Sequence, residues 1–296
     1  MRDLYHSLLS ERNTPFYVFD EQGFVDNYHA LEEAMRSIYP KYEISYSYKT
    51  NYTPYICSLI KRMGGYAEVV SDMEYTLAKR IGYPNNKIVY NGPAKGSLLC
   101  EHLRNDGITN IDNYDEAMRI ARMAREDENN RYRVGVRINL DVGDDFISRF
   151  GMDPNGDEII QAILVLNKAG VTINGLQCHI SRHRDIQAWA KRTEIMLSAA
   201  DRYISGIPEY ISLGSGMFAD MPDELKKQFG DSVPKYMDYA DVALRPIEKH
   251  YQGEVKPVVF TEPGTTLVSR YISFVSKVLS IKQIRGRYMA TMDGSC

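Results

Sequence analysis

The chain has 296 residues, of which 44% are hydrophobic and 25% are charged, and its formal net charge is −3. These values are typical of a globular protein and exclude a disordered, collagen-like or coiled-coil chain. So small a net charge, without runs of like charge, also excludes the electrostatic footprint of a protein that binds nucleic acid or an anionic membrane surface.

The N-terminal segment and the cysteines indicate the compartment. Residues 1–16 carry charges where a secretory signal peptide needs an apolar core, and no stretch of about 18 apolar residues could cross a bilayer. The cysteines form no CxxC pair, which favours reduced thiols over a disulfide framework or a zinc site: Cys57, Cys100, Cys178 and Cys296. We therefore expect a cytoplasmic protein without a metal centre.

From residue 43 onward, short β-branched or aromatic segments alternate with segments of helical period, which is typical of strand–helix units around a parallel sheet. The predicted strands are Glu43–Tyr48, Tyr66–Val70, Lys87–Tyr90, Ile108–Ile111, Arg133–Asn139, Gly175–Ile180, Glu209–Leu213 and Pro257–Thr261. The predicted helices are Gly23–Ile38, Pro54–Met63, Met73–Ile81, Gly96–Arg104, Tyr114–Glu126, Asp157–Lys168, Asp185–Tyr203 and Val233–His250. Eight strands over about 220 residues match an α/β fold of the (β/α)8 TIM barrel type better than an open doubly wound sheet, which stays the alternative.

The pattern changes after the eighth strand. Tyr271–Ile281 and Tyr288–Met292 are rich in β-formers, a polar turn is predicted over Lys282–Arg287, and no helix is expected. Two strands cannot bury their own faces, so we expect the start of a truncated C-terminal β-domain, with which Pro15–Asp20 could pair. The predicted domains are a barrel over 21–268 and a β-domain remnant made of 1–20 and 269–296.

Lys49 is the most informative residue of the first strand. Side chains alternate along a strand, so Lys49 lies on the same face as Ser45 and Ser47, opposite Ile44, Tyr46 and Tyr48. If the bulky residues pack on the helices, the amine points into the barrel mouth above two small side chains. A desolvated lysine has a lowered pKa and forms Schiff bases with carbonyls, although a solvated lysine at a strand end is the alternative.

The same alternation collects polar side chains at the carboxyl ends of other strands. Arg137 shares a face with Gly135 and Asn139, His179 shares one with Gln177 and Ser181, and Glu262 follows the eighth strand. Each residue alone would be an ordinary structural group. Together they lie where barrels keep their chemistry. The turns Leu213–Met217 and Glu262–Thr266 could in addition bind a phosphate through backbone N–H groups, or be simple tight turns.

Seven motifs occur in the order and at the spacing of a known family: residues 46–51 (YSYKTN), 68–74 (EVVSDME), 137–139 (RIN), 149–152 (RFGM), 178–181 (CHIS), 213–216 (LGSG) and 262–264 (EPG). The chain resembles, from about Thr14 to Gly294, the pyridoxal-phosphate-dependent decarboxylases of the alanine-racemase-like fold, the diaminopimelate and ornithine decarboxylase family.

The resemblance implies a role for each matching residue. Lys49 would bind pyridoxal 5′-phosphate as a Schiff base, His179 would stack on the pyridine ring, and Glu262 would contact the pyridine nitrogen, which makes the ring a better electron sink. The remaining cofactor-binding candidates are Arg137, Gly214, Ser215, Gly216, Gly264 and Thr265. Glu74 and, more weakly, Glu68 resemble polar residues that support the site.

Departures from the family pattern concern the phosphate and the end of the chain. Ser215 replaces a glycine, Thr265 replaces an arginine, and Ser181-Arg182 replaces Gly-Ser, so Arg182 could supply part of the missing positive charge. The family's β-domain carries a Cys-Glu/Asp-Ser stretch and a late tyrosine that complete the partner's site. The chain stops before them, Cys296 is not assigned to that role, and the chain alone is expected to be catalytically incomplete.

We therefore predict a lyase that decarboxylates a diamino or otherwise polar amino acid. An amino-acid racemase of the same fold is one alternative, against which Glu262 argues because such racemases tend to place an arginine at the pyridine nitrogen. A non-catalytic protein that binds pyridoxal phosphate is the other. The expected partners are a small amino acid and, in the full-length protein, a second copy of the chain, but neither nucleic acid nor a membrane.

Overall fold

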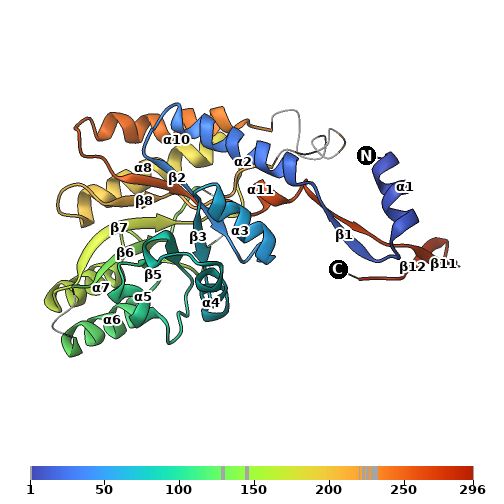
Figure 1. The fold of residues 1–296 in the computed structure, drawn as a ribbon. Coiled ribbons are helices and arrows are strands. Elements are labelled where there is room, and N and C mark those ends of the chain that lie inside the picture. The colour runs from blue at the N-terminus through green and yellow to red at the C-terminus, as the bar shows by residue number, and fades with distance from the viewer. Residues whose placement is uncertain are drawn as a thin grey trace.

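The structure, a computed structural model, describes residues 2–127, 131–143, 147–219 and 233–295, together with residues 221, 224 and 227. Eight parallel strands close into a barrel in chain order (Figure 1). They are β2 (Tyr42–Ser47), β3 (Tyr66–Val69), β4 (Ile88–Tyr90), β5 (Ile108–Ile111), β6 (Arg133–Ile138), β7 (Thr172–Cys178), β8 (Tyr210–Ser212) and β9 (Val258–Thr261). Each corresponds to a predicted strand with small shifts of its ends, and the prediction of a (β/α)8 barrel is confirmed.

Helices surround the barrel (Figure 1). They are α2 (Glu21–Arg36), α3 (Pro54–Arg62), α4 (Asp72–Ile81), α5 (Leu99–Arg104), α6 (Tyr114–Glu126), α7 (Asp157–Lys168), α8 (Ile186–Tyr203) and α10 (Tyr236–His250). Among the described residues, three elements were not predicted, namely α1 (Arg2–Glu11), the 3₁₀ turn η1 (Asn85–Lys87) and α11 (Thr265–Val268). The expectation of no helix after the eighth strand is therefore wrong, because a helix as short as α11 leaves no 3.6-residue period in the sequence.

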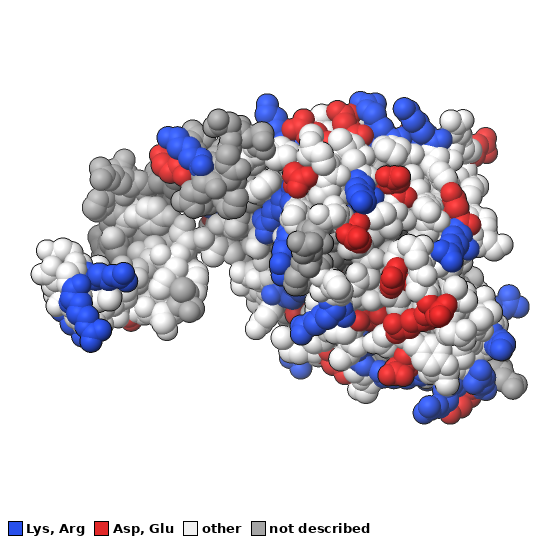
Figure 2. Space-filling model, turned by 180° about the vertical axis from the view of Figure 1, so that it is seen from behind, with Lys and Arg blue, Asp and Glu red and all other residues white. Residues whose placement is uncertain are grey.

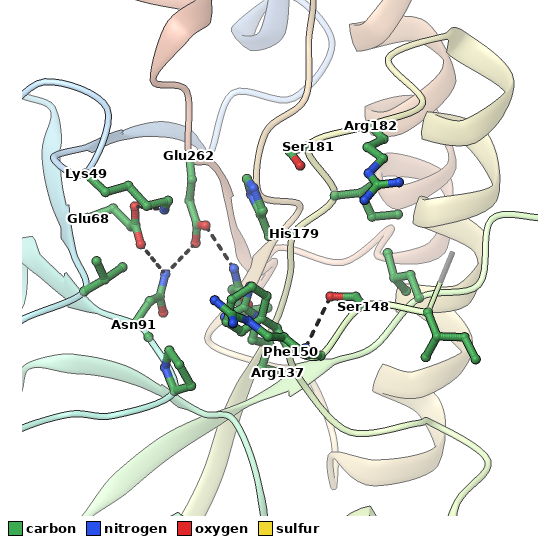
Figure 3. A pocket seen from close by; sticks show the side chains of 18 residues that line it. Lys49, Glu68, Asn91, Arg137, Ser148, Phe150, His179, Ser181, Arg182 and Glu262 are labelled. Carbon is green, nitrogen blue, oxygen red and sulfur yellow. Dashed lines mark hydrogen bonds and ion pairs between the residues drawn. The ribbon is translucent and has the colours of Figure 1, made fainter. Parts of the chain in front are cut away.

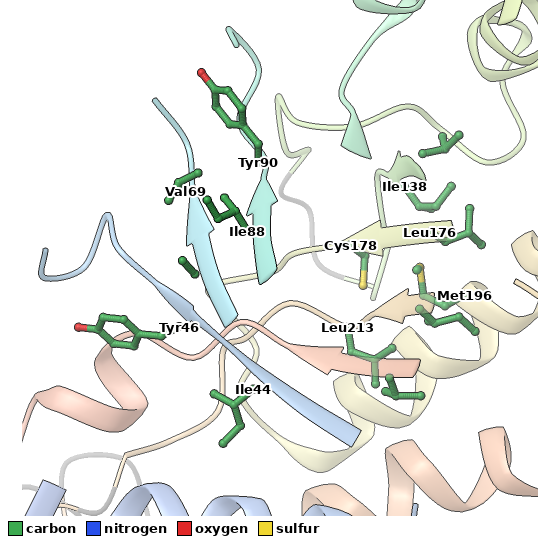
Figure 4. Close-up of a cluster of buried hydrophobic side chains, with 14 of the residues drawn as sticks. Ile44, Tyr46, Val69, Ile88, Tyr90, Ile138, Leu176, Cys178, Met196 and Leu213 are labelled. Atoms are coloured by element: carbon green, nitrogen blue, oxygen red, sulfur yellow. The ribbon is translucent and has the colours of Figure 1, made fainter. Parts of the chain in front are cut away.

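The core lies between the strands and the surrounding helices. Figure 4 shows Ile44, Tyr46, Val69 and Leu176 among its buried side chains. Ser45 and Ser47 of β2 are also buried but lie on the other face of the strand, so the predicted alternation along this strand is the one observed. This alternation is what turns the polar side chains of the strands toward the inside of the barrel.

Two antiparallel strand pairs lie outside the barrel. β1 (Phe16–Phe19) pairs with β10 (Ile272–Val275), so the predicted pairing of the N-terminal segment is confirmed. β11 (Val278–Ile284) pairs with β12 (Arg287–Met292), and the predicted turn over Lys282–Arg287 is too long. The loop is only Arg285 and Gly286, with φ of 51° and 79°, the left-handed conformation that two-residue hairpin loops favour.

The surface carries charges of both signs, and three of the cysteines are free. On the face shown in Figure 2, acidic and basic side chains are interspersed rather than gathered into one patch. Among the described residues, no helix is long and apolar enough to span a membrane, and no group of side chains has the make-up of a metal site. Cys57, Cys100 and Cys178 are free thiols, whereas Cys296 lies outside the described residues.

Candidate active site

A cavity of about 570 Å³ opens at the carboxyl ends of the barrel strands (Figure 3). It is lined by Lys49, Glu68, Val70, Asn91, Gly92, Pro93, Arg137, Leu140, Ile147, Ser148, Arg149, Phe150, Gln177, His179, Ile180, Ser181, Arg182 and Glu262. Lys49, Arg137, His179 and Glu262, all predicted from strand faces and ends, therefore meet in one cavity.

Lys49 and Glu68 form the polar pair on one side of the cavity. The Lys49 Nζ atom lies 2.7 Å from Oε2 of Glu68, and the lysine side chain is 40% exposed, whereas the carboxylate is buried. Ser47 donates a second hydrogen bond to the same carboxylate oxygen. Burial alone would raise the pKa of Glu68, but the charge and hydrogen bond of Lys49 outweigh it, and the pKa lies below the ordinary value. Glu68 is thus a carboxylate that orients the amine.

Glu262 is a second buried carboxylate, and neutral donors hold it. Oε1 accepts hydrogen bonds from Ser212 at 2.8 Å and from the Asn91 amide at 3.0 Å, and Oε2 accepts one from the Gln177 amide at 2.9 Å. Burial, and then the charge of Glu68, raise the pKa of Glu262 above its ordinary value. The donors fix the carboxylate in the cavity without a cation bonded directly to it.

His179 and Arg137 extend from β7 and β6. Burial, followed by the charges of Lys49 and Arg137, lowers the pKa of His179 to about 3, so the imidazole is neutral at neutral pH. The backbone N–H of Ser215 lies 3.4 Å from His179 Nδ1, which places the ring proton on Nε2. Arg137 is bound to Asp112 at 3.1 Å and covers the ring of Phe150. A neutral flat ring beside the amine suits stacking on an aromatic ligand.

The predicted phosphate turns adjoin the cavity, but of their residues only Glu262 lines it. Gly214 and Gly216 have φ of 62° and 101°. A Cβ at Gly214 would lie 2.2 Å from the carbonyl oxygen of Cys178, and one at Gly264 would lie 2.0 Å from Thr50 Oγ1. A side chain therefore does not fit at Gly214 or Gly264, and the surface of both turns at these positions is backbone. Thr265 is exposed at the start of α11 and also lies outside the cavity lining.

Of the remaining candidate residues, some line the cavity and some do not. Arg182 and Ser181 line the cavity, whereas Glu74 does not. Glu74 accepts a hydrogen bond from the backbone N–H of Val70, and its own N–H donates to Ser71 at the start of α4, which makes it part of a helix cap.

Sequence reasoning missed two residues that hold the site. Asn91, after β4, links Glu68 with Glu262, and only its position behind a strand could have pointed to it. Arg192 of α8 is 0% exposed, and its Nη1 donates to the carbonyl oxygens of Leu213 and Ser215, at 2.8 Å each. A buried arginine in a helix face otherwise made for packing is the signal that could have found it. Its positive charge lies directly behind the glycine turn.

These residues fit pyridoxal phosphate. The cavity offers an amine for the aldehyde, a neutral imidazole for the ring and a buried carboxylate for the ring nitrogen. The Oε1 atom of Gln177 is buried without a hydrogen-bond partner among the described residues, so the cavity wall retains an unused acceptor. Glycine at positions 214, 216 and 264, where a Cβ would clash, keeps these turns free of side chains, as a turn that binds phosphate through its backbone requires.

Comparison with known proteins identifies the family. The family model described as "Pyridoxal-dependent decarboxylase, pyridoxal binding domain" matches residues 26–269. Diaminopimelate decarboxylase of Methanocaldococcus jannaschii is 28% identical over 294 residues, which are 93% of this chain and 66% of that protein. The Bacteroides thetaiotaomicron enzyme of the same name is 28% identical over 298 residues, 95% of this chain and 73% of the relative.

A solved structure gives the same result. The structure of diaminopimelate decarboxylase from M. jannaschii in co-complex with L-lysine matches with a TM-score of 0.79 and 25% identity, over 97% of this chain and 69% of that one. The chain thus spans about two thirds of the length of the M. jannaschii enzyme. Together with the cavity at the barrel mouth, these matches show that the chain belongs to the family of pyridoxal-dependent decarboxylases and contains its pyridoxal-binding domain.

Proposed function

We propose that this protein decarboxylates an amino acid with pyridoxal 5′-phosphate as its cofactor, and that the substrate is a diamino acid. The observation that carries the proposal is the position of Lys49 and Glu262 in one cavity, with Glu68 bound to the amine and His179 beside it. The names of the relatives support the substrate class, since both are diaminopimelate decarboxylases and one was solved with L-lysine.

Residues of this chain would contact each part of the cofactor. Lys49 would bind the cofactor aldehyde covalently, with Glu68 orienting its Nζ atom. The Gly214–Gly216 turn, Gly264 and Thr265 would surround the phosphate. His179 would cover one face of the ring, and Arg137 is held beside it by Asp112.

Glu262 would hold a proton at the ring nitrogen. When bound, the cofactor supplies an electron sink for the carbanion left by the departing CO₂. An ionised carboxylate opposite a protonated nitrogen would keep that positive charge in place and so strengthen the electron sink. Racemases of this fold tend to place an arginine at that nitrogen instead, and Glu262 is therefore the reason to place decarboxylation above racemisation.

The test is release of CO₂ from a panel of L- and D-amino acids by the full-length gene product. We expect release from a diamino acid, loss of release in Lys49→Ala, and retention in Lys41→Ala, whose lysine is exposed at the opposite end of β2. Interconversion of enantiomers without CO₂ would instead identify a racemase. Cofactor binding without turnover of any amino acid would identify a carrier.

We also propose the division into a barrel over 21–268 and a β-domain made of 1–20 and 269–296. The pairing of β1 with β10 supports it, because these strands, from the two ends of the chain, form a sheet of their own outside the barrel. A homodimer in the full-length protein and a cytoplasmic location stay predictions of the sequence.

A further inference from the structure

A chain of hydrogen bonds runs from the interior of the barrel to the two buried carboxylates. The hydroxyl of Tyr210 lies 2.8 Å from Oδ1 of Asn110, and Nδ2 of Asn110 lies 2.9 Å from Oδ1 of Asn91. Nδ2 of Asn91 then lies 3.0 Å from Oε1 of Glu262 and 3.3 Å from Oε1 of Glu68 (Figure 3). All five side chains are at most 3% exposed, and Tyr210 and Asn110 do not line the cavity.

The two carboxylates at the end of this series decide which group donates and which accepts in each of its hydrogen bonds. Ionised carboxylates only accept hydrogen bonds, so the Asn91 NH₂ group must face Glu68 and Glu262, one N–H to each. The Asn91 carbonyl then points the other way and accepts from the Asn110 amide. The Asn110 carbonyl in turn accepts from Tyr210, whose hydroxyl is a donor. The same hydroxyl also lies 3.4 Å from the carbonyl oxygen of Thr109, which is the longer of its two acceptor contacts.

The barrel makes room for Tyr210 in this place. A Cβ on Gly135 would lie 2.2 Å from the Tyr210 hydroxyl and 2.2 Å from Asn110 Oδ1, and one on Gly175 would lie 2.4 Å from the tyrosine ring. Two neighbouring strands, β6 and β7, thus carry glycine where the tyrosine of β8 crosses the interior. Any side chain at Gly135 would occupy the position of the Tyr210–Asn110 hydrogen bond.

We propose that Tyr210 and Asn110 are positioning residues that fix the Asn91 amide with both of its N–H groups toward the carboxylates, and thereby keep Glu262 ionised for its role at the cofactor ring nitrogen. The last clause rests on the proposed function, whereas the effect on Glu262 itself does not. A donor directed at a carboxylate favours its charged form, so loss of the fixed amide should favour the neutral acid.

Other charges also act on Glu262 and must be held constant in a test. The titratable groups that face it are Lys49 just after β2, Glu68 on β3, Cys178 on β7, Tyr210 on β8 and Arg192 on α8. Burial and the Glu68 charge already raise the pKa of Glu262, so the hydrogen bonds from Asn91, Ser212 and Gln177 work against a substantial penalty. Replacement of the tyrosine hydroxyl leaves the other charges in place.

The first experiment uses the cofactor-free protein, Tyr210→Phe, which keeps the ring, and Tyr39→Phe as the matched control. The Tyr39 hydroxyl is also buried and donates at 2.8 Å, but to the carbonyl oxygen of Pro257. The protonated-carboxyl infrared band of Glu262, identified by its loss in Glu262→Gln, is titrated with pH. We expect its midpoint to rise by about 0.5–1 pH unit in Tyr210→Phe, and to stay in place in Tyr39→Phe.

Asn110→Leu, an apolar side chain of similar size, is the second variant and keeps the test decisive if Tyr210→Phe does not fold. It should raise the same midpoint at least as much. An unchanged Glu262 midpoint in the folded variants, or an equal change in Tyr39→Phe, would overturn the proposal.

The second experiment separates this proposal from the proposed function. In the loaded full-length protein, Tyr210→Phe should lower kcat by about 3- to 10-fold and leave KM and the Kd for pyridoxal phosphate within about 2-fold, because the change reaches only Glu262. A raised infrared midpoint in a protein without decarboxylase activity would support the positioning of Glu262 and overturn the catalytic role. Full activity in a variant with a raised midpoint would overturn the link between the two.

Discussion

Glu68 and Glu262 share one amide donor, Asn91, but differ in every other hydrogen-bond partner. Glu68 is bound to the cation of Lys49, and its pKa is lowered, whereas Glu262 is bound by neutral groups, and its pKa is raised. Two nearby carboxylates with different pKa values are typical of active sites in which the two groups have different chemical roles. Glu68 orients an amine, and under the proposed function Glu262 would hold a proton at the cofactor.

Glu262→Gln keeps the shape of the side chain and removes its charge. We expect cofactor binding to persist and decarboxylation to slow by about 10²-fold or more, the scale of one lost preorganised electrostatic contact. Absorbance of the bound cofactor and single-turnover CO₂ release measure the two effects. Glu209→Gln, at the opposite end of the barrel, is the control and should behave as the unaltered protein. Unchanged turnover in Glu262→Gln would assign the ring nitrogen to another group.

His102 predicts a pH dependence of stability that is separate from catalysis. It belongs to α5 and is fully buried against the ring of Tyr75, and burial lowers its pKa to about 4, against about 6.5 in an unfolded chain. Between these values only the unfolded chain binds the proton, so stability falls as pH drops from about 6.5 to about 4, by up to about 1.4 kcal/mol per pH unit.

Urea unfolding of the cofactor-free protein over this pH range measures the effect. His102→Gln should remove that part of the slope, whereas His29→Gln, on the exposed face of α2, should not. An equal slope in both variants would mean that other groups, His179 among them, cause the acid sensitivity.

For a helix or strand, the periodicity of the sequence predicts which face a side chain lies on, because that depends only on its neighbours in the chain. The alternation along β2, β6 and β7 places Lys49, Arg137 and His179 at the cavity, because strand side chains have a period of two. Strand periodicity does not predict the contacts of Arg192, because its partners Leu213 and Ser215 come 21 and 23 residues later in the chain. The extent of β11 was hidden for another reason, since its exposed polar residues are typical of a turn.

The series of hydrogen bonds from Tyr210 to Asn91 could not be predicted from the sequence for the same reason. Tyr210, Asn110 and Asn91 come from three strands that are not all neighbours in the sheet, and only barrel closure brings them together. Each residue alone is an ordinary side chain of a buried strand. The domain limits, the dimer and the roles of the site residues stay predictions.

Arg192 leads to a prediction for the turn after β8. Arg192→Met would leave the carbonyl oxygens of Leu213 and Ser215 buried without a donor, at a cost of about 1–3 kcal/mol for each. It would also remove a positive charge behind the turn that we propose to bind the phosphate. We expect a lower unfolding temperature and about 10-fold weaker binding of pyridoxal phosphate.

Thermal unfolding with and without the cofactor, and a cofactor titration, distinguish these effects. Arg202→Met is the control, because Arg202 lies exposed on the same helix. Cofactor affinity unchanged in Arg192→Met would show that the arginine serves only the fold.

At the scale of the whole molecule, the β11–β12 hairpin lies apart from the barrel, beyond the β1–β10 pair (Figure 1). Its apolar side chains face solvent, with Leu279 61% exposed, Ile281 66% and Tyr288 76%. Exposed apolar strands with free edges pair readily with other strands. The hairpin is thus the part of the described chain most suited to association.

We expect the 296-residue chain to have a mass in solution above that of a monomer, and Ile281→Lys to lower it. Light scattering during size-exclusion chromatography measures this over a range of concentrations. Leu164→Lys places the same charge on an exposed apolar position of α7 and should not change the mass. A monomer at all concentrations, or equal effects of both substitutions, would contradict association through the hairpin.

Reduction of the loaded protein with borohydride, followed by peptide mass mapping, shows which lysine binds the cofactor. We expect one reduced pyridoxal phosphate adduct, on the peptide that contains Lys49, which is absent from Lys49→Ala and present in Lys41→Ala. An adduct on another lysine, or one that persists undiminished in Lys49→Ala, would contradict it.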